Sequence, residues 1–214
     1  MAATLRPHDL VRLRDVRDVA AEGDLPSWAT AALATLPLVV VRRARAPDGL
    51  VAIGIRGRLR HQRAAAMVRR AAVVERIAPE RLAADAAWRR IRSSPRPQIP
   101  ALGALEAVSV LLSGLDVAWG PTGSVGFELA GGVPAAWPDS DLDLLVRRGS
   151  PWPIAAARGA LAALDRLAVR TDVQIETPLG SIALREYARD RAPLLLRTLD
   201  GPRLVADPWR DDAA

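Results

Sequence analysis

The sequence has no cysteine and no lysine, and it is poor in histidine, phenylalanine and tyrosine. Without Cys, the chain has no disulfide, no thiol nucleophile and no Cys-ligated metal. Its two His exclude a site built from several histidines, so any metal must be held mainly by oxygen. The single Phe and single Tyr argue against a base-stacking platform for RNA.

Long apolar runs are also missing. The chain has no stretch of about 18 or more uncharged apolar residues, the length that a membrane-spanning helix needs. Charged residues such as Arg6, Asp9 and Arg12 stand where a signal peptide would have an apolar segment. We therefore expect no membrane contact and a cytoplasmic location.

The positive charge of the chain comes entirely from arginine. Arg accounts for all 30 basic residues, and the net charge is +6. A basic surface is one signature of nucleic-acid binding, but an Arg-for-Lys bias in composition explains the same count. Arg also binds phosphate oxygens in a bidentate fork, so an anionic substrate would benefit in either case.

A proline-rich linker divides the chain. The 214 residues, half of them apolar, suffice for one large domain or two small ones. Residues 93–100 contain three prolines and form the clearest linker. We predict an N-terminal domain over residues 1–94 that binds substrate or partner, and a catalytic domain over residues 95–214.

The N-terminal domain is predicted to be a small α/β unit. The β-branched runs at 38–42 and 50–55 flank the turn Pro47-Asp48-Gly49, which predicts a hairpin. Residues 62–77 are rich in Ala and Arg, which favours a helix.

The C-terminal domain alternates helix and strand patterns. Leu105, Val108 and Leu112 recur at helical spacing after Leu102, and Gly114 follows as a stop. Further along, we expect helices over 125–130 and 154–168, and strands over 117–119, 141–147, 171–177, 194–199 and 203–205. Helices that flank a mixed sheet make the whole an α+β protein with α/β-like character.

The candidate chemistry begins with two acidic residues. Asp141 and Asp143 are two apart on a predicted strand, so both carboxylates face the same way. Such a pair repels unless it is neutralised, and Mg²⁺ prefers carboxylates together with phosphate oxygens and water. Asp172 lies on the polar face of a second predicted strand, and it completes a triad if the two strands are neighbours. A triad of this kind is suited to metal-assisted attack on phosphorus.

The loop that ends in Gly123-Ser124 supplies a second half to this site. Gly lets the backbone approach a phosphate closely, and the N-terminus of the following helix presents free N–H groups. Ser124 either caps that helix or donates to a phosphate oxygen. Neither Gly-Ser nor Asp-x-Asp is specific alone, but their order between helices and strands favours a nucleotidyltransferase core. The alternative is that residues 139–143 form a solvated acidic loop.

Longer motifs around these residues resemble a known family, the malonate decarboxylase holo-acyl-carrier-protein synthases, which are phosphoribosyl-dephospho-CoA transferases. The resemblance is carried by the segments at 119–130, 140–145, 172–178 and 201–205, and by 6–10 and 54–63 in the N-terminal part. It therefore covers nearly the whole chain, and the acidic positions follow the family's pattern.

The resemblance implies a specific reaction. Family members move phosphoribosyl-dephospho-CoA from 2′-(5″-triphosphoribosyl)-3′-dephospho-CoA to a serine of the decarboxylase's apo acyl carrier subunit, and diphosphate leaves. On this basis Asp141 and Asp143 would bind Mg²⁺ or Mn²⁺, and Asp172 would be a third ligand or the base for the incoming hydroxyl. Gly123 and Ser124 would hold the leaving phosphates. Four basic residues are candidates to contact the triphosphate or dephospho-CoA, on one cationic strand face or just after it: Arg56, Arg58, Arg60 and Arg63.

Two other interpretations stay open at this point. The first is a different nucleotidyltransferase, which would use the same acidic triad with ATP on a small molecule or protein. The second is a basic RNA- or DNA-binding module in which the acidic pair is incidental. The ordered acidic residues and the shortage of Phe and Tyr argue against the second, so we expect no nucleic-acid partner.

Overall fold

The computed structural model describes residues 4–21, 23–91 and 98–210, and its chain divides into two compact units. They comprise Met1–Ala78 and Pro79–Ala214, and each combines helices with a six-stranded sheet, as expected of an α+β protein. The division falls earlier in the chain than residue 94, the expected boundary. The linker residues 93–97 lie outside the described residues.

Side chains of residues 79–91 explain why this segment belongs to the C-terminal unit. Glu80 accepts two hydrogen bonds from Nη1 of the largely buried Arg147, at 2.7 and 3.0 Å. The fully buried Trp88 donates from its indole nitrogen to Glu106 at 2.9 Å and packs beside Trp119. These contacts join the segment to a helix and two strands that come later in the sequence.

The N-terminal unit is an antiparallel sheet in the strand order β2-β5-β4-β3-β1-β6, with one α-helix against it. Its elements are β1 (Leu10–Leu13), β2 (Val19–Ala20), α1 (Ser27–Thr35), β3 (Leu38–Val41), β4 (Leu50–Arg56), β5 (Arg63–Arg69) and β6 (Val73–Ile77). The predicted hairpin is confirmed as the pair β3–β4. The core lies between α1 and the sheet, where Leu33, Val39 and Ile53 are buried.

The helix expected over residues 62–77 is wrong. The segment forms β5, a single 3₁₀ turn (Arg70–Ala72) and β6, and β5 pairs with β4 along its whole length. Ala66 and Val68 point into the core, while Arg63 and Arg69 are exposed. Helix propensity is a weak preference that sheet pairing and burial override. The period-two pattern was present, but its inward side chains are too small to stand out.

A buried ion pair joins β1 to β6 in this unit. Asp9 is fully buried, and its Oδ2 accepts hydrogen bonds from the backbone N–H of Arg6 at 2.8 Å and from Nε of Arg76 at 2.5 Å. A buried carboxylate is costly unless it is paired and hydrogen-bonded. Asp9 therefore fixes the turn that enters β1.

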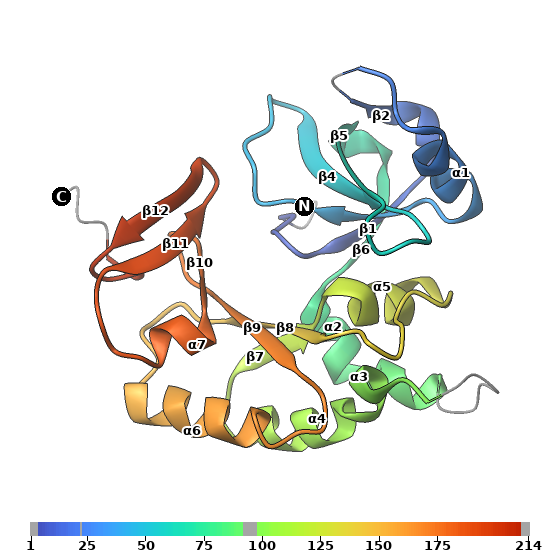
Figure 1. The fold of residues 1–214 in the computed structure, drawn as a ribbon. Helices are drawn as coiled ribbons and strands as arrows, with labels where there is room; N and C mark the ends of the chain where they lie inside the picture. Colours follow the sequence, from blue (N-terminus) through green and yellow to red (C-terminus); the bar gives the residue numbers. More distant parts are fainter. Residues whose placement is uncertain (1–3, 22, 92–97, 211–214) are drawn as a thin grey trace. The chain divides into compact units, whose positions relative to one another are not determined.

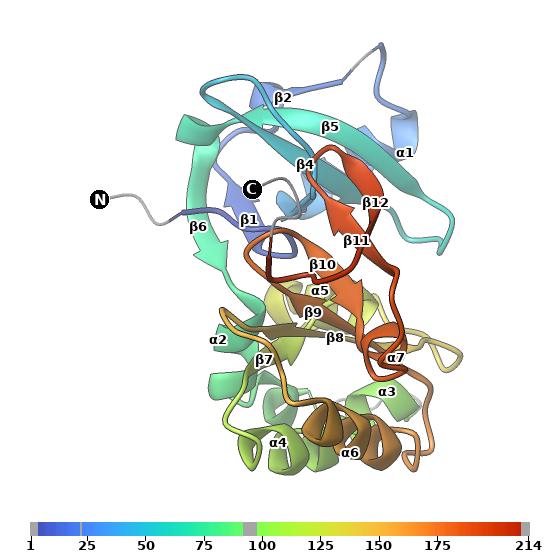
Figure 2. The same ribbon diagram turned by 90° about the vertical axis from the view of Figure 1, so that its left-hand side faces the viewer.

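The C-terminal unit contains a mixed sheet in the order β12-β11-β10-β9-β8-β7, in which only β8 and β9 are parallel. Its elements are α2 (Pro79–Ala84), a 3₁₀ helix (Ala87–Arg90), α3 (Pro100–Gly103), α4 (Leu105–Ser113), β7 (Ala118–Pro121), α5 (Gly123–Gly131), β8 (Leu142–Arg147), α6 (Ile154–Leu164), β9 (Thr171–Glu176), β10 (Ser181–Ala183), α7 (Leu184–Tyr187), β11 (Leu194–Thr198) and β12 (Gly201–Val205). Helices α4 and α6 lie along one face of β7–β9, and α5 lies on the other (Figures 1 and 2).

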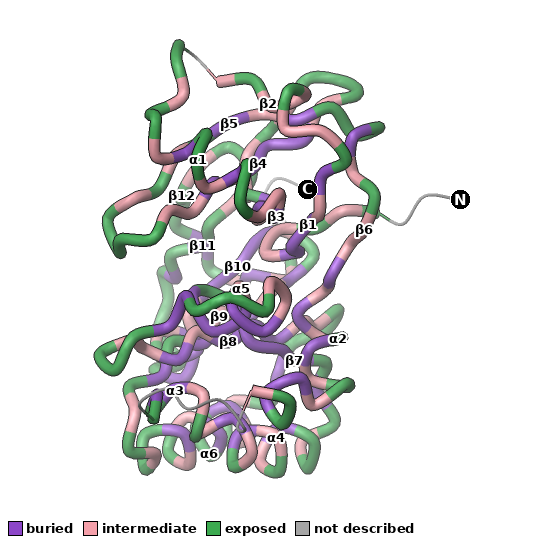
Figure 3. Tube along the Cα trace, turned by 90° about the vertical axis from the view of Figure 1, so that its right-hand side faces the viewer, coloured by how far each residue is buried: buried purple, intermediate pink, exposed green. Residues whose placement is uncertain are grey.

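The core of this unit is centred on β8 and β9. Asp143 lies against α5, so alternation puts the buried Leu142, Leu144 and Val146 on the opposite face of β8. Their register partners Val173 and Ile175 continue that face on β9. The tube in Figure 3 shows the buried stretch running through β7, β8 and β9. Helix α6 connects β8 to β9, because two parallel neighbours need a long crossover.

Most of the expected C-terminal elements are confirmed. Helices α4, α5 and α6 and strands β7, β8, β9, β11 and β12 all occur, with shifts of a few residues at their ends. The short elements α2, β10 and α7 were missed, as were β1, β2 and α1 in the N-terminal unit. No helix in the described ranges has the length and apolar character to cross a membrane.

We predict that Asp9→Ala lowers the free energy of unfolding by about 3 kcal/mol, because the substitution leaves Arg76 without its buried partner. Urea denaturation followed by circular dichroism measures this change. Asp24→Ala, at an exposed position of the same unit, is the control and should change stability by less than about 0.5 kcal/mol. Equal stabilities of the two variants would contradict the prediction.

Candidate active site

The parallel pair β8–β9 brings two carboxylates together. Asp143 and Asp172 are register partners, so they lie on neighbouring strands about 4.8 Å apart and on the same face. The expectation that the strands of Asp143 and Asp172 are neighbours is confirmed. Asp141 directly precedes β8, two residues before Asp143. All three acidic residues are at least partly exposed, as a binding site requires.

The loop before α5 packs directly against Asp143. The backbone N–H of Thr122 donates to the carbonyl oxygen of Asp143 at 2.9 Å. Gly123 adopts a φ of +58°, and a Cβ at this position would lie 1.8 Å from Oδ2 of Asp143. Both the backbone angle and the space therefore require glycine, and the absent side chain lets the carboxylate lie against the start of the helix.

The N-terminus of α5 offers unpaired N–H groups beside this carboxylate. The helix begins at Gly123, and Thr122 is its N-cap in extended conformation without a side-chain cap hydrogen bond. Ser124 is therefore the second helical residue, so the idea that it caps the helix is wrong. Its N–H lies in the first turn, where N–H groups have no intrahelical acceptor and the helix dipole favours an anion.

The same sheet face carries a hydrogen-bonded chain that sequence reasoning missed. Nη1 of Arg197 on β11 donates to Oε1 of Gln174 at 2.8 Å, and Nε2 of Gln174 donates to Oδ1 of Asp172 at 3.3 Å. Because a guanidinium only donates and a carboxylate only accepts, the Gln174 amide has a single favourable orientation. Gln174 and Arg197 thus position Asp172. The sequence pointed to Gln174 only by its position two residues after Asp172, which puts both side chains on the same strand face.

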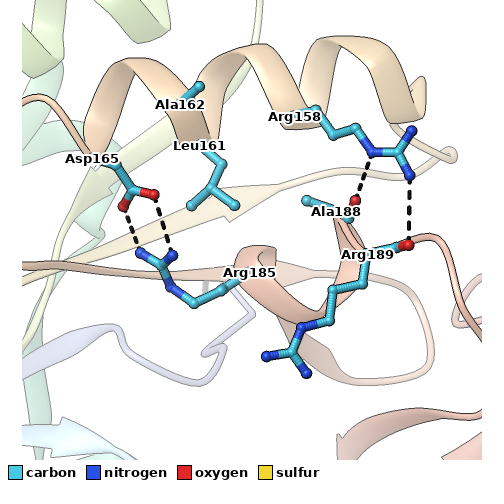
Figure 4. A pocket seen from close by; sticks show the side chains of 7 residues that line it. All are labelled: Arg158, Leu161, Ala162, Asp165, Arg185, Ala188 and Arg189. Atoms are coloured by element: carbon cyan, nitrogen blue, oxygen red, sulfur yellow. Dashed lines mark hydrogen bonds and ion pairs between the residues drawn. The ribbon is translucent and has the colours of Figure 1, made fainter.

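A pocket of about 360 Å³ lies between α6 and α7 in the same unit (Figure 4). Arg185 donates two hydrogen bonds to the carboxylate of Asp165, the shorter at 2.5 Å. Arg158 donates to the carbonyl oxygen of Ala188 at 2.8 Å. The pKa of Arg185 is raised, first by its hydrogen bonds to Asp165, then by the charge of Asp165, and further by the charge of Asp172. Arg185 is therefore near enough to Asp172 for the charge of that carboxylate to act on it.

Metal binding was expected at Asp141, Asp143 and Asp172. Over the described ranges, no group of three or more His, Asp or Glu side chains is disposed to hold a metal ion. Two carboxylates on adjacent strands nevertheless suit Mg²⁺, which commonly takes one or two carboxylates and completes its octahedron with water and substrate phosphates. One of these carboxylates, that of Asp143, lies against the start of α5 because Gly123 has no side chain.

The predicted basic substrate contacts belong to the N-terminal unit. Arg56 and Arg63 are register partners at the ends of β4 and β5. Arg58 and Arg60 are exposed in the connection between these strands, so the expected alternation along a single strand face is wrong. The strand ends because Gly57 packs against Gln62 and Trp28, where a Cβ would lie 2.4 and 2.8 Å from their side-chain atoms.

These features define an α+β protein whose C-terminal unit gathers paired carboxylates and a helix N-terminus on one sheet face. Family models match both units. Residues 6–79 match the model described as the phosphoribosyl-dephospho-CoA transferase MdcG N-terminal domain, and residues 82–208 match the corresponding C-terminal domain. No solved structure matches the chain significantly.

Curated relatives agree with this assignment. A phosphoribosyl-dephospho-CoA transferase of Pseudomonas putida is 43% identical over 204 residues, which is 95% of each chain. A protein of the same name from Azotobacter vinelandii is 42% identical over 212 residues, or 98% of this chain and 96% of the relative. One from Pseudomonas aeruginosa is 42% identical over 204 residues, with coverage of 95% and 93%. The chain belongs to the phosphoribosyl-dephospho-CoA transferase family, and it is a transferase.

We predict that Gly123→Ala destabilises the C-terminal unit by about 2 kcal/mol or more, through the strained backbone and the clash with Asp143. The matched control is Gly159→Ala, at an open position inside α6, which should stabilise by about 0.5–1 kcal/mol. Urea denaturation compares both with the wild type. A Gly123→Ala protein as stable as the wild type would show that no close approach to Asp143 exists.

A second prediction concerns Gln174. Gln174→Leu keeps the side-chain size but removes both hydrogen bonds, and it should lower kcat about tenfold by freeing Asp172. In an Asp172→Asn background the same substitution should have no further effect, because coupled residues are non-additive. Gln98→Leu, at an exposed position of the same unit, is the control for steady-state kinetics. Additive losses would contradict a role through Asp172.

Proposed function

We propose that the protein transfers phosphoribosyl-dephospho-CoA from 2′-(5″-triphosphoribosyl)-3′-dephospho-CoA to a serine of the apo acyl carrier subunit of malonate decarboxylase. Membership of the phosphoribosyl-dephospho-CoA transferase family supports the transferred group. The observation that carries the mechanism is the register pairing of Asp143 with Asp172 beside the N-terminus of α5. We place the reaction in the cytoplasm.

The reaction is a displacement at phosphorus. The serine oxygen forms a bond to the α-phosphorus of the donor, the bond from that phosphorus to the bridging oxygen breaks, and diphosphate leaves. The protein has no thiol, so the thiol of the product is that of the donor's pantetheine arm. The nucleophile is the partner's serine, which leaves this chain to position groups, balance charge and accept a proton.

The start of α5 suits the leaving group. The first-turn N–H groups at Gly123 and Ser124 donate to the β- and γ-phosphates, and the positive end of the helix dipole favours their charge. Binding here orients the bond that breaks toward the acidic pair.

The acidic residues act at the α-phosphorus, on the other side of the bond that breaks. Asp143 and Asp172, with Asp141, would hold Mg²⁺ or Mn²⁺, which supplies charge neutralisation to the phosphoryl oxygens when bound. Oδ1 of Asp172 already accepts from Gln174, which leaves Oδ2 to act as a ligand or to take the hydroxyl proton of the incoming serine. Arg56, Arg58, Arg60 and Arg63 are proposed to bind anionic groups of the donor.

We predict that Asp141→Ala, Asp143→Asn and Asp172→Asn each reduce transfer by at least about 100-fold, because each removes negative charge at the reacting centre. The assay mixes the protein with apo carrier subunit, donor and Mg²⁺ and reads the intact mass of the carrier by mass spectrometry. The expected mass gain is that of phosphoribosyl-dephospho-CoA.

The matched control is Asp116→Asn, an exposed residue between α4 and β7 whose positive φ of 51° an asparagine also tolerates. Its transfer rate should equal that of the wild type. Transfer of a nucleotide from ATP in place of the donor group would overturn the proposed function. Full activity in the Asp143→Asn protein would overturn the assignment of the acidic pair.

A further inference from the structure

The segment between α5 and β8 leads directly into the acidic site and is held by a buried carboxylate. Glu128 on α5 is only 1% exposed, and its Oε2 accepts the backbone N–H groups of Ala135 at 2.8 Å and Ala136 at 2.9 Å. Hydrogen bonds to an ionised carboxylate are strong, and they offset the cost of burying it. Glu128 therefore fixes the segment to the helix that starts at Gly123.

The next residue, Trp137, opens a tight turn. Its N–H donates to Oγ of Ser140 at 2.9 Å, and the N–H of Ser140 donates back to the carbonyl oxygen of Trp137 at 3.0 Å. Pro138 occupies the second position of this turn, where its fixed φ is favoured. The backbone of Trp137 is thus held from both sides, by the Glu128 anchor before it and by the Ser140 turn after it.

Trp137 is exposed, unlike the other tryptophans of the chain. Trp88, Trp119 and Trp152 are buried, and the two other tryptophans are half-buried, whereas Trp137 is 49% exposed. It is the only one of the six Trp classed as exposed. An exposed indole on a firmly held backbone is a ready stacking surface, because little conformational entropy is lost when a ring is laid on it.

The turn also sets how far Trp137 lies from the acidic residues. The ends of a β-turn are less than about 7 Å apart, and Asp141 follows Ser140 by one more Cα–Cα step, so the Cα atoms of Trp137 and Asp141 lie within about 11 Å. In the donor, two ribose rings separate the reacting phosphorus from the adenine. These two rings are the part of the donor that our proposal places between the acidic residues and Trp137.

We propose that the indole of Trp137 stacks on the adenine of the donor's dephospho-CoA part. The inference rests on the proposed function for the identity of the donor, and it adds the residue that recognises its base. Every purine has a flat π face, so stacking on Trp supplies affinity without a hydrogen-bond pattern. Trp137 is a binding residue, and the chemistry remains with the acidic site.

The test uses 3′-dephospho-CoA as the probe, because it has the adenine but no triphosphoribosyl arm and does not react. Its Kd is measured by isothermal titration with the full chain. Trp137→Ala should weaken binding about tenfold, whereas Trp137→Phe should keep most of the affinity. Val110→Ala is the control, since it removes an exposed apolar side chain from α4, on the other sheet face.

A second probe separates stacking from a change in the fold. 4′-Phosphopantetheine lacks the adenosine, so any binding of it should be equal in the wild type and in Trp137→Ala. The KM for the full donor should rise about tenfold in Trp137→Ala, with kcat nearly unchanged. An unchanged Kd for 3′-dephospho-CoA, or an equal loss with 4′-phosphopantetheine, would overturn the inference.

The two proposals fail separately. If the wild type does not transfer the group to the carrier subunit but its binding of 3′-dephospho-CoA depends on Trp137, the acceptor reaction is wrong and the stacking assignment stands. If transfer proceeds and Trp137→Ala binds and reacts like the wild type, the proposed function stands and the stacking assignment is wrong.

Discussion

The parallel pairing of β8 with β9 is the constraint on which the site depends. It places Asp143 directly beside Asp172, although 28 positions separate them in the chain numbering. Parallel neighbours require a crossover, and α6 supplies it while burying Ala157, Ala160 and Leu164. The same buried stripe that stabilises the unit therefore also fixes the spacing of the two carboxylates.

Two carboxylates this close repel each other, and the surrounding structure shows how that repulsion is managed. The positive end of α5 lies against Asp143, and the chain from Arg197 through Gln174 directs a hydrogen bond to Asp172. Groups of positive charge and hydrogen-bond donors therefore surround both carboxylates.

The N-terminal unit is built on a different principle. Its sheet is entirely antiparallel, and the buried pair of Asp9 and Arg76 fixes the entry to β1. Its four candidate substrate residues are placed by the β4–β5 hairpin, two at the strand ends and two in the exposed connection. An exposed connection rich in arginine suits an anionic ligand, since side chains there keep the freedom to adapt to phosphate.

The sequence by itself determined the elements with strong local signals. Alternation of polar and apolar residues identified β8 and β9, helical spacing identified α4 and α6, and Gly123-Ser124 marked the start of α5, because these patterns depend only on the period of the backbone. The longer motifs also carried the family resemblance that the comparisons bear out. Local patterns were misleading at β5 and β6, where small alanines hid the strand period and helix propensity pointed the wrong way.

Only the tertiary structure decided which side chains meet. Asp172 neighbours Asp143, and Gln174 connects Asp172 to Arg197, through pairings between strands that are distant in the sequence. Glu128 holds the segment that carries Trp137 because a nearby loop folds back onto α5. Neither spacing nor composition encodes such contacts. The entropy lost in closing the intervening chain is offset by apolar burial over the whole sheet, which no local pattern reveals. The sequence identified the acidic residues as candidates, but the side chains that contact them follow from tertiary packing alone.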